Sequence, residues 1–222
     1  MTASAERASP TRRYPRGSDE FGRVLAFSDG LFAIAMTLLV VGIVVPEVAD
    51  PDSIDDLADA LGDLSDSIVS FVISFAVIGR YWIAHHQMFS LLGAMDRGLI
   101  TLNLVYLGFV AFLPFPTALL GNFFDNPLAF TVYAVAIAAV SGMEVVMLRH
   151  AHRAGLLARP MPEDVFRFGA LMSLSPVVFF LASIPVAFWS SEVAVVMWFL
   201  GIPLGIWGNR RAPAGAAEYF DY

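Results

Sequence analysis

The chain has 222 residues, 58% of them hydrophobic, and a formal net charge of -7. Its mean hydropathy of +0.70 and its repeated long apolar runs exclude an ordinary soluble domain and indicate a polytopic membrane protein. The absence of cysteine excludes a disulfide framework, a thiolate metal site and a cysteine nucleophile, and the acidic balance gives no support to nucleic-acid binding.

Charged residues alternate between the two sides of the expected membrane. All 13 basic residues are arginines, and except for Arg80 they lie at the termini, near Arg97, or between Arg149 and Arg167. The segments between them carry acids, most densely in 47–66. The positive-inside rule therefore predicts an even number of spans with both termini in the cytoplasm. We predict an all-α protein with a single repeat of six transmembrane helices, at 24–45, 67–93, 98–119, 128–148, 165–188 and 192–207.

The chain divides into three parts on this interpretation. Residues 1–22 form a polar cytoplasmic tail that we expect to be disordered, residues 23–209 form the six-helix transmembrane domain, and residues 210–222 form a short, mobile cytoplasmic tail. The first apolar run is too long for a signal peptide, and no small-x-small cleavage site follows it, so we expect the span to be retained.

The first span carries one carboxylate. Asp29 lies about 9 Å past Arg23 by helical rise, and a charge at this depth is costly unless it is paired. At about 100° per residue, Asp29 and Ser28 point away from an apolar stripe on the same helix. The stripe consists of Ile34, Leu38, Val41 and Val45, with Thr37 at its edge.

Polar residues of the next two spans lie at a similar depth. His85 lies about 12 Å from the inner end of the second span, and Asn103 lies about 7 Å into the third. The layer formed with Ser28 and Asp29 has three interpretations: a proton relay, a catalytic His/Asp pair, or a hydrogen-bond latch that orients the first span. We favour the latch, because neither a nucleophile nor a metal site accompanies the pair.

The remaining spans give further expectations. An amphipathic turn is predicted in the acidic loop 46–65, and Pro114 and Pro116 should break the third span. Glu144 is expected to pair with an arginine at the cytoplasmic side, whereas Arg80 near mid-membrane has no assigned role.

Two histidines, His150 and His152, fall in a predicted inner loop, 149–164. At a spacing of i, i+2 they do not share a helix face, and this argues against a metal site.

Three parts of the sequence carry a resemblance to a known family: the motif Arg23-x-x-x-Phe27-Ser28-Asp29, the motif Trp82-x-x-His85 and the segment Asn103–Pro116. With them the chain resembles the transmembrane protein 175 family of lysosomal potassium channels and their prokaryotic relatives. The resemblance covers nearly the whole chain. It implies a potassium-permeable channel subunit whose first helix lines the path for potassium and other monovalent cations. The implied site residues are Ile34 at the constriction, Leu38 and Val41 in the lining, Thr37 for cation preference, and Arg23, Phe27, Ser28, Asp29, Trp82, His85 and Asn103 in the latch network.

The resemblance also predicts assembly and selectivity. Animal relatives carry two six-span repeats and dimerise, so a chain with one repeat implies a homotetramer. The sequence has no TVGYG-like P-loop filter, and passage through an aliphatic ring predicts only a modest preference for potassium over sodium. No cofactor or enzymatic activity is expected. A cytoplasmic membrane of a bacterium is the expected location, with the lipid bilayer as the surroundings.

Two other functions stay open on the residues alone. Asp29 and His85 within the membrane would also suit a proton-coupled secondary transporter. The same pair would suit an intramembrane enzyme, although no substrate cavity is evident from the sequence.

Overall fold

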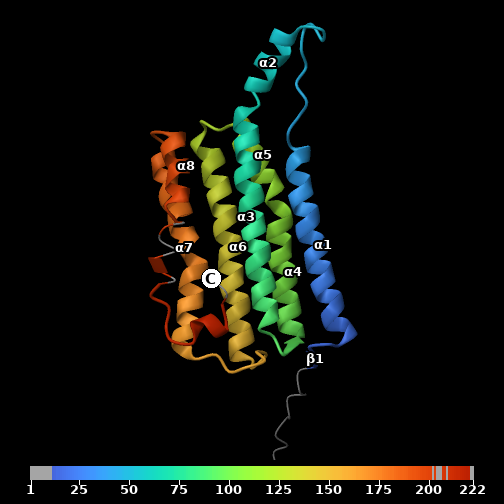
Figure 1. Ribbon diagram of the computed structural model, residues 1–222, viewed down its shortest axis with the longest axis vertical. Helices are drawn as coiled ribbons and strands as arrows, with labels where there is room; N and C mark the ends of the chain where they lie inside the picture. Colours follow the sequence, from blue (N-terminus) through green and yellow to red (C-terminus); the bar gives the residue numbers. More distant parts are fainter. Residues whose placement is uncertain (1–11, 202, 204–206, 209, 221–222) are drawn as a thin grey trace, which may run out of the picture.

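The computed structural model describes residues 12–201, 203, 207–208 and 210–220, and long parallel and antiparallel helices dominate it (Figure 1). Within these described ranges, five segments are long and apolar enough to cross a membrane. They are α1 (Asp19–Val41), α3 (Ser65–Ser90), α4 (Arg97–Phe112) followed by α5 (Pro114–Asn122), α6 (Pro127–Arg153) and α7 (Glu163–Ala187). The all-α membrane fold predicted from the sequence is confirmed.

The sixth predicted span, 192–207, begins as α8 (Ser191–Phe199) beside α7. Residues 202 and 204–206 of this span lie outside the described residues. After them the chain is described again at η1 (Ala216–Glu218), and Tyr219 donates a hydrogen bond of 2.8 Å to the carbonyl of Pro160, next to the start of α7. The chain has therefore returned along the length of the bundle, as an even number of crossings requires.

Local sequence signals set the helix boundaries. At the start of α1, the Ser18 side chain accepts a hydrogen bond from the backbone amide of Phe21. At the start of α6, the Asn126 side chain accepts one from the backbone amide of Leu128. The third crossing is broken at Leu113, because Pro114 has no amide hydrogen for the helix ladder. The break predicted from the two prolines is confirmed.

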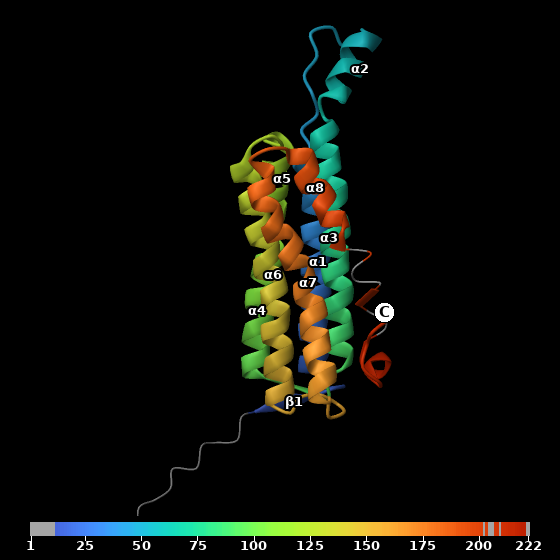
Figure 2. The ribbon, with the colours of Figure 1, turned by 90° about the vertical axis from the view of Figure 1, so that its left-hand side faces the viewer.

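One short helix stands outside the bundle. In the outer loop, α2 (Ile54–Gly62) forms where the acidic amphipathic turn is predicted, and Figures 1 and 2 show it projecting beyond one end of the bundle. Its N-terminal Ser53 accepts the amide of Asp56, and none of its residues is buried.

Two short strands close the opposite end, which we call the strand end. The strand β1 (Arg13–Pro15) pairs antiparallel with β2 (Ala94–Asp96), and the guanidinium of Arg16 donates to the carbonyl of Ser90 at 2.6 Å. The expectation of a disordered tail through residue 22 is therefore wrong for residues 13–22. Polar composition suggested disorder, but backbone pairing with a distant strand fixes this segment directly before α1.

Asp96 ties three elements together at the strand end. Its carboxylate accepts the amide of Leu99 at 2.7 Å, which caps α4, and lies 2.9 Å from Nε2 of His150 at the end of α6. Gly98 leaves room for this contact, since a methyl group there would lie 2.7 Å from Cε1 of His150. Burial would raise the pKa of Asp96, but the Leu99 amide, the His150 ring and the nearby Arg13 charge hold it below its usual value of 3.8.

A pH-dependent stability follows from this lowered pKa. The carboxylate stabilises the folded state fully above its usual pKa, and the contribution is lost as the pH falls through the lower folded-state value. We expect Asp96→Asn to lower the free energy of unfolding by about 1.5 kcal/mol near pH 5, as for a hydrogen bond to a charged group. Thermal unfolding in detergent should show the difference from wild type shrinking below about pH 4. A difference that grows in acid would contradict this role.

Two predictions about the chain beyond residue 148 need correction. The helix α6 continues through Arg153, so His150 and His152 lie in its last turn rather than in a loop. His152 lies 3.5 Å from a carboxylate oxygen of Glu163, and the described residues contain no group of three or more metal-ligating side chains. The C-terminal tail was expected to be mobile, but Ala216 is fully buried against Met161 and neighbouring apolar residues.

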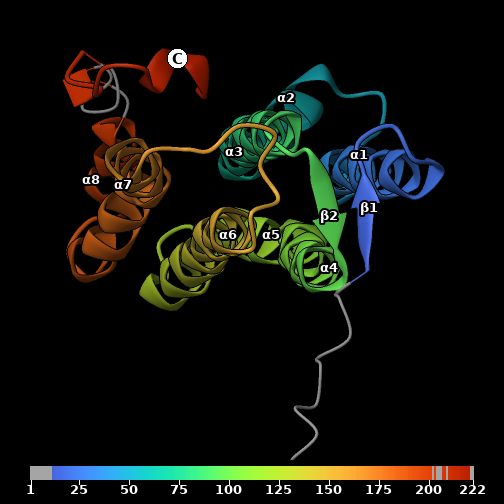
Figure 3. The same cartoon turned by 90° about the horizontal axis from the view of Figure 1, so that it is seen from below.

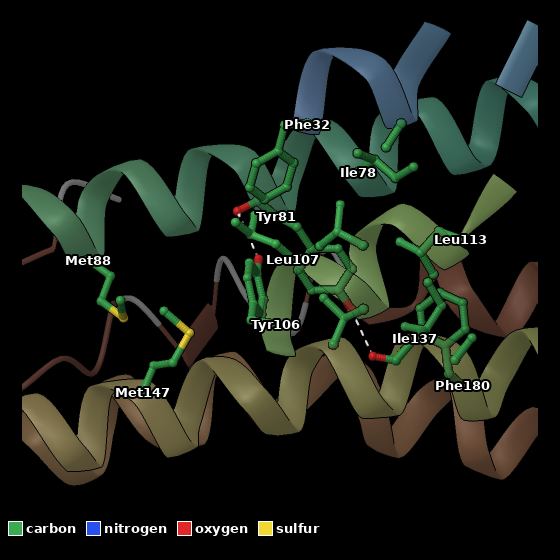
Figure 4. Close-up of a cluster of buried hydrophobic side chains, with 14 of the residues drawn as sticks. Phe32, Ile78, Tyr81, Met88, Tyr106, Leu107, Leu113, Ile137, Met147 and Phe180 are labelled. Carbon is green, nitrogen blue, oxygen red and sulfur yellow. Dashed lines mark hydrogen bonds between the residues drawn. The ribbon is translucent and has the colours of Figure 1, made fainter. Parts of the chain in front are cut away.

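The core lies between α3, α4, α5 and α6 and also includes buried side chains of α1, α7 and α8. Buried hydroxyl groups join the helices at its centre. Tyr81 donates or accepts a 2.7 Å bond with Ser141, and Thr117 donates to Ser74 at 2.8 Å. Figure 4 shows the aromatic and aliphatic side chains that fill this region. By contrast, α1 stands at one edge of the bundle, where it contacts α3, α4 and α5 (Figures 1 and 3).

Candidate functional site

The edge helix α1 has two different faces. One face is buried against α3 and α4 and carries Phe21, Ser28, Phe32, Ala35 and Leu39. These positions are separated by seven, four, three and four residues, which is the spacing of a helix face that packs on neighbours. The opposite face is uncovered in the single chain.

The uncovered face carries the apolar stripe predicted from the sequence. Ile34 is 60% exposed, Leu38 46% and Val41 71%. Thr37 is exposed on the same face, and its hydroxyl donates to the carbonyl of Ile34 at 2.9 Å within the helix. The side chains that could line a path therefore point away from the rest of the chain.

A directed chain of hydrogen bonds fixes the buried face. The amide nitrogen of Asn103 donates to the hydroxyl of Ser28 at 3.0 Å, and the hydroxyl donates to the carbonyl of Val24 at 2.9 Å. On the other side, Nε2 of His85 lies 2.8 Å from the amide oxygen of Asn103. The network joins α1, α3 and α4, and Ser28, His85 and Asn103 are all at most 2% exposed.

Asp29 is held by a separate bond. The indole nitrogen of Trp82, on α3, donates to a carboxylate oxygen of Asp29 at 3.0 Å. Trp82 also contacts His86 one turn along, with ring centroids 5.8 Å apart. The structure thus places Asp29 and His85 with different partners, and no hydrogen bond joins them directly in the described part of the chain.

Two residues of the predicted latch lie elsewhere. Arg23 and Phe27 are on the exposed face of α1, and Phe27 is 55% exposed. Arg23 lines an open groove near the strand end together with Arg16 and His86. In the described residues they are not joined to the Ser28 or Asp29 bonds.

Sequence reasoning missed the partner of Glu144. Its carboxylate accepts the hydroxyl of Tyr106 at 3.2 Å, and it does not form an ion pair with an arginine of the strand end in the described residues. Arg80, which had no assigned role, lines the same cavity of about 520 Å³ as Glu144, between α3, α6, α7 and α8. Tyr106 follows Asn103 by three residues and therefore shares its helix face. This spacing was the signal in the sequence that could have placed the Tyr106 hydroxyl inside the bundle.

Comparisons with known proteins identify relatives of this chain. The family model described as "Endosomal/lysosomal potassium channel TMEM175" matches residues 23–114. A Streptomyces collinus protein named a potassium channel is 41% identical over 146 residues, covering 64% of this chain and 69% of that protein. A mouse protein named "Endosomal/lysosomal proton channel TMEM175" is 26% identical over 149 residues, covering 67% of this chain and 30% of that protein.

A solved structure also shares the fold. The crystal structure of a lysosomal potassium-selective channel TMEM175 homolog from Chamaesiphon minutus superimposes with a TM-score of 0.71 at 31% sequence identity. The match covers 89% of this chain and 100% of that chain. The identity and coverage of the Streptomyces relative, together with this fold, show that the chain belongs to the TMEM175 family.

Proposed function

We propose that this chain is one subunit of a potassium-permeable cation channel of a bacterial cytoplasmic membrane. The observation that carries the proposal is the uncovered apolar face of α1 at the edge of the bundle. Ile34 forms the narrowest ring of the path, with Leu38 and Val41 in the lining and Thr37 tuning cation preference. The Streptomyces relative named a potassium channel supports potassium as the permeant ion.

Several copies are needed to enclose a path. One subunit offers one such face, and a rotation axis parallel to α1 would bring identical faces together. We propose a homotetramer, in which residues 23–209 form the conducting unit. The segments 1–22 and 210–222 lie on the cytoplasmic side, which is then the strand end. This orientation places the arginine-rich segments inside and the acidic loop with α2 outside.

The buried bonds of α1 act as the latch in this proposal. Two sets of hydrogen bonds fix the rotation of α1 so that its apolar stripe faces the axis. Trp82 bonds to Asp29, and Asn103, itself bonded to His85, bonds to Ser28. An aliphatic ring removes water from a cation without replacing it by carbonyl oxygens, so we propose only a modest preference for potassium over sodium.

Proton movement is the second candidate function, because the mouse relative is named a proton channel. Both candidates are tested in liposomes that contain the purified full chain and an outward potassium gradient. A channel is expected to pass potassium without a proton gradient, and flux should continue only when a protonophore carries the compensating charge. Potassium flux that continues without the protonophore would show that the protein itself moves the compensating protons, and it would contradict a channel that passes potassium alone.

A further inference from the structure

The direction of the hydrogen bonds at Asn103 determines which ring nitrogen of His85 carries a proton. The amide nitrogen of Asn103 donates to Ser28, so its amide oxygen faces Nε2 of His85. An oxygen acceptor requires a hydrogen on Nε2. In the neutral ring, Nδ1 of His85 is then a lone pair that needs a donor.

That lone pair is buried and has no partner among the described residues. His85 is 2% exposed, and its ring is stacked between Phe89, at 4.2 Å between centroids, and Tyr106, at 5.6 Å. Both neighbouring rings present apolar faces to it. Buried ring nitrogens are normally hydrogen-bonded, so the environment of Nδ1 is incomplete without a small donor.

A cavity of about 50 Å³ lies beside this ring. Since one water occupies about 10–15 Å³ of such volume, the cavity has room for water. Glu144 and Arg80 also line it and supply an acceptor and a donor. Figure 4 shows Met88 from α3 and Met147 from α6, which both line the cavity, pointing toward each other beside Tyr106.

We propose that each subunit contains a buried water site between α3, α4 and α6, in which water donates a hydrogen bond to Nδ1 of His85, and that Phe220 closes this site. The water completes the hydrogen bonding of the residue that holds Asn103 and, through it, Ser28 of α1. The site lies inside the subunit and is separate from the path proposed along the exposed face of α1.

The segment that carries Phe220 is built to close the site. Ala216 is fully buried, and the Tyr219 hydroxyl fixes the segment to the carbonyl of Pro160. Phe220 lines the cavity and packs against Gly169 of α7. A methyl group at Gly169 would overlap the Phe220 ring, so the glycine provides the space in which the ring sits.

The chain contains no cysteine, so a single introduced thiol can report access to the site. Met147→Cys, at a position that is 1% exposed, is labelled in lipid nanodiscs with a cationic methanethiosulfonate reagent. We expect slow labelling in the otherwise unchanged chain and about ten-fold faster labelling when Phe220→Ala or Gly169→Ala is added, because thiol reactivity follows access. Met95→Cys, fully buried and outside the cavity, is the matched control and should stay slow in every background.

The closure is overturned if Phe220→Ala leaves the labelling of Met147→Cys unchanged, or if it accelerates Met95→Cys equally. Met88→Cys replaces Met147→Cys should the latter fail to fold. The water is tested separately by a map of the tetramer or subunit at a resolution that shows ordered water. We expect a peak within about 3.2 Å of His85 Nδ1. Ordered water elsewhere in the protein interior but not there overturns the site.

Discussion

Replacing Asn103 by leucine is expected to destabilise the protein more than any other single change in the polar layer. The substitution removes both bonds of the side chain and leaves the Nε2 hydrogen of His85 and one acceptor position of the Ser28 hydroxyl without partners inside the bundle. A buried unsatisfied group costs about 1–3 kcal/mol, whereas interhelical bonds in membranes average about 0.6 kcal/mol. We expect a loss of about 2–4 kcal/mol, which corresponds to roughly 5–15 °C in thermal unfolding.

Asn122→Leu is the matched control for this experiment. Asn122 is exposed on α5, and its amide donates to the carbonyl of Ala118 in the same helix. An exposed change of this kind is expected to stay within about 0.5 kcal/mol of wild type. Equal unfolding temperatures for Asn103→Leu and Asn122→Leu would show that the network does not hold α1 in place.

The second large effect is expected on ion flux. Ile34→Asn would place an amide from each subunit at the proposed constriction, where it can hydrogen-bond water that an aliphatic ring excludes. We expect sodium flux in liposomes to rise about ten-fold, equivalent to lowering the barrier by about 1.4 kcal/mol. The ratio of potassium to sodium flux should fall, because dehydration at the ring no longer separates the two ions.

Val40→Asn tests whether the position on α1 matters. Val40 is 53% exposed, similar to Ile34, but it lies about 120° around the helix from it. This variant is expected to keep the wild-type flux ratio. If both variants change the ratio equally, or if only Val40→Asn does, the lining assigned to Ile34, Leu38 and Val41 is wrong.

The depth of the polar layer could be predicted from helical rise alone. Counting along each span placed Ser28, Asp29, His85 and Asn103 at one level, and three of these side chains are linked in the structure. Their pairing was not predictable, since it depends on the rotation of each helix about its axis. For this reason Trp82, not His85, is the partner of Asp29.

The ends of the chain were harder to predict than the spans. Strands of three residues, such as Arg13–Pro15, have no periodic pattern, and their partners lie some 80 residues away. The segment near Ala216 was equally hard to predict, because its burial depends on contacts with Met161 and Val165, far earlier in the chain, rather than on its own composition. Glu144 is another example. An arginine at the cytoplasmic side was the expected partner, whereas the packing of α4 on α6 places the Tyr106 hydroxyl against its carboxylate.

The bonds that hold α1 are unevenly distributed along its length. Hydrogen bonds hold the first half of the helix to its neighbours: those of β1 and Arg16 directly before it, and those of Ser28 and Asp29 within it. Beyond Asp29, the described contacts of the helix with other elements are apolar packing alone. Packing of this kind has no preferred direction, unlike a hydrogen bond. In the proposed channel, we therefore expect widening at Ile34 to move the half of α1 beyond Asp29, while the half that is held by hydrogen bonds stays in place.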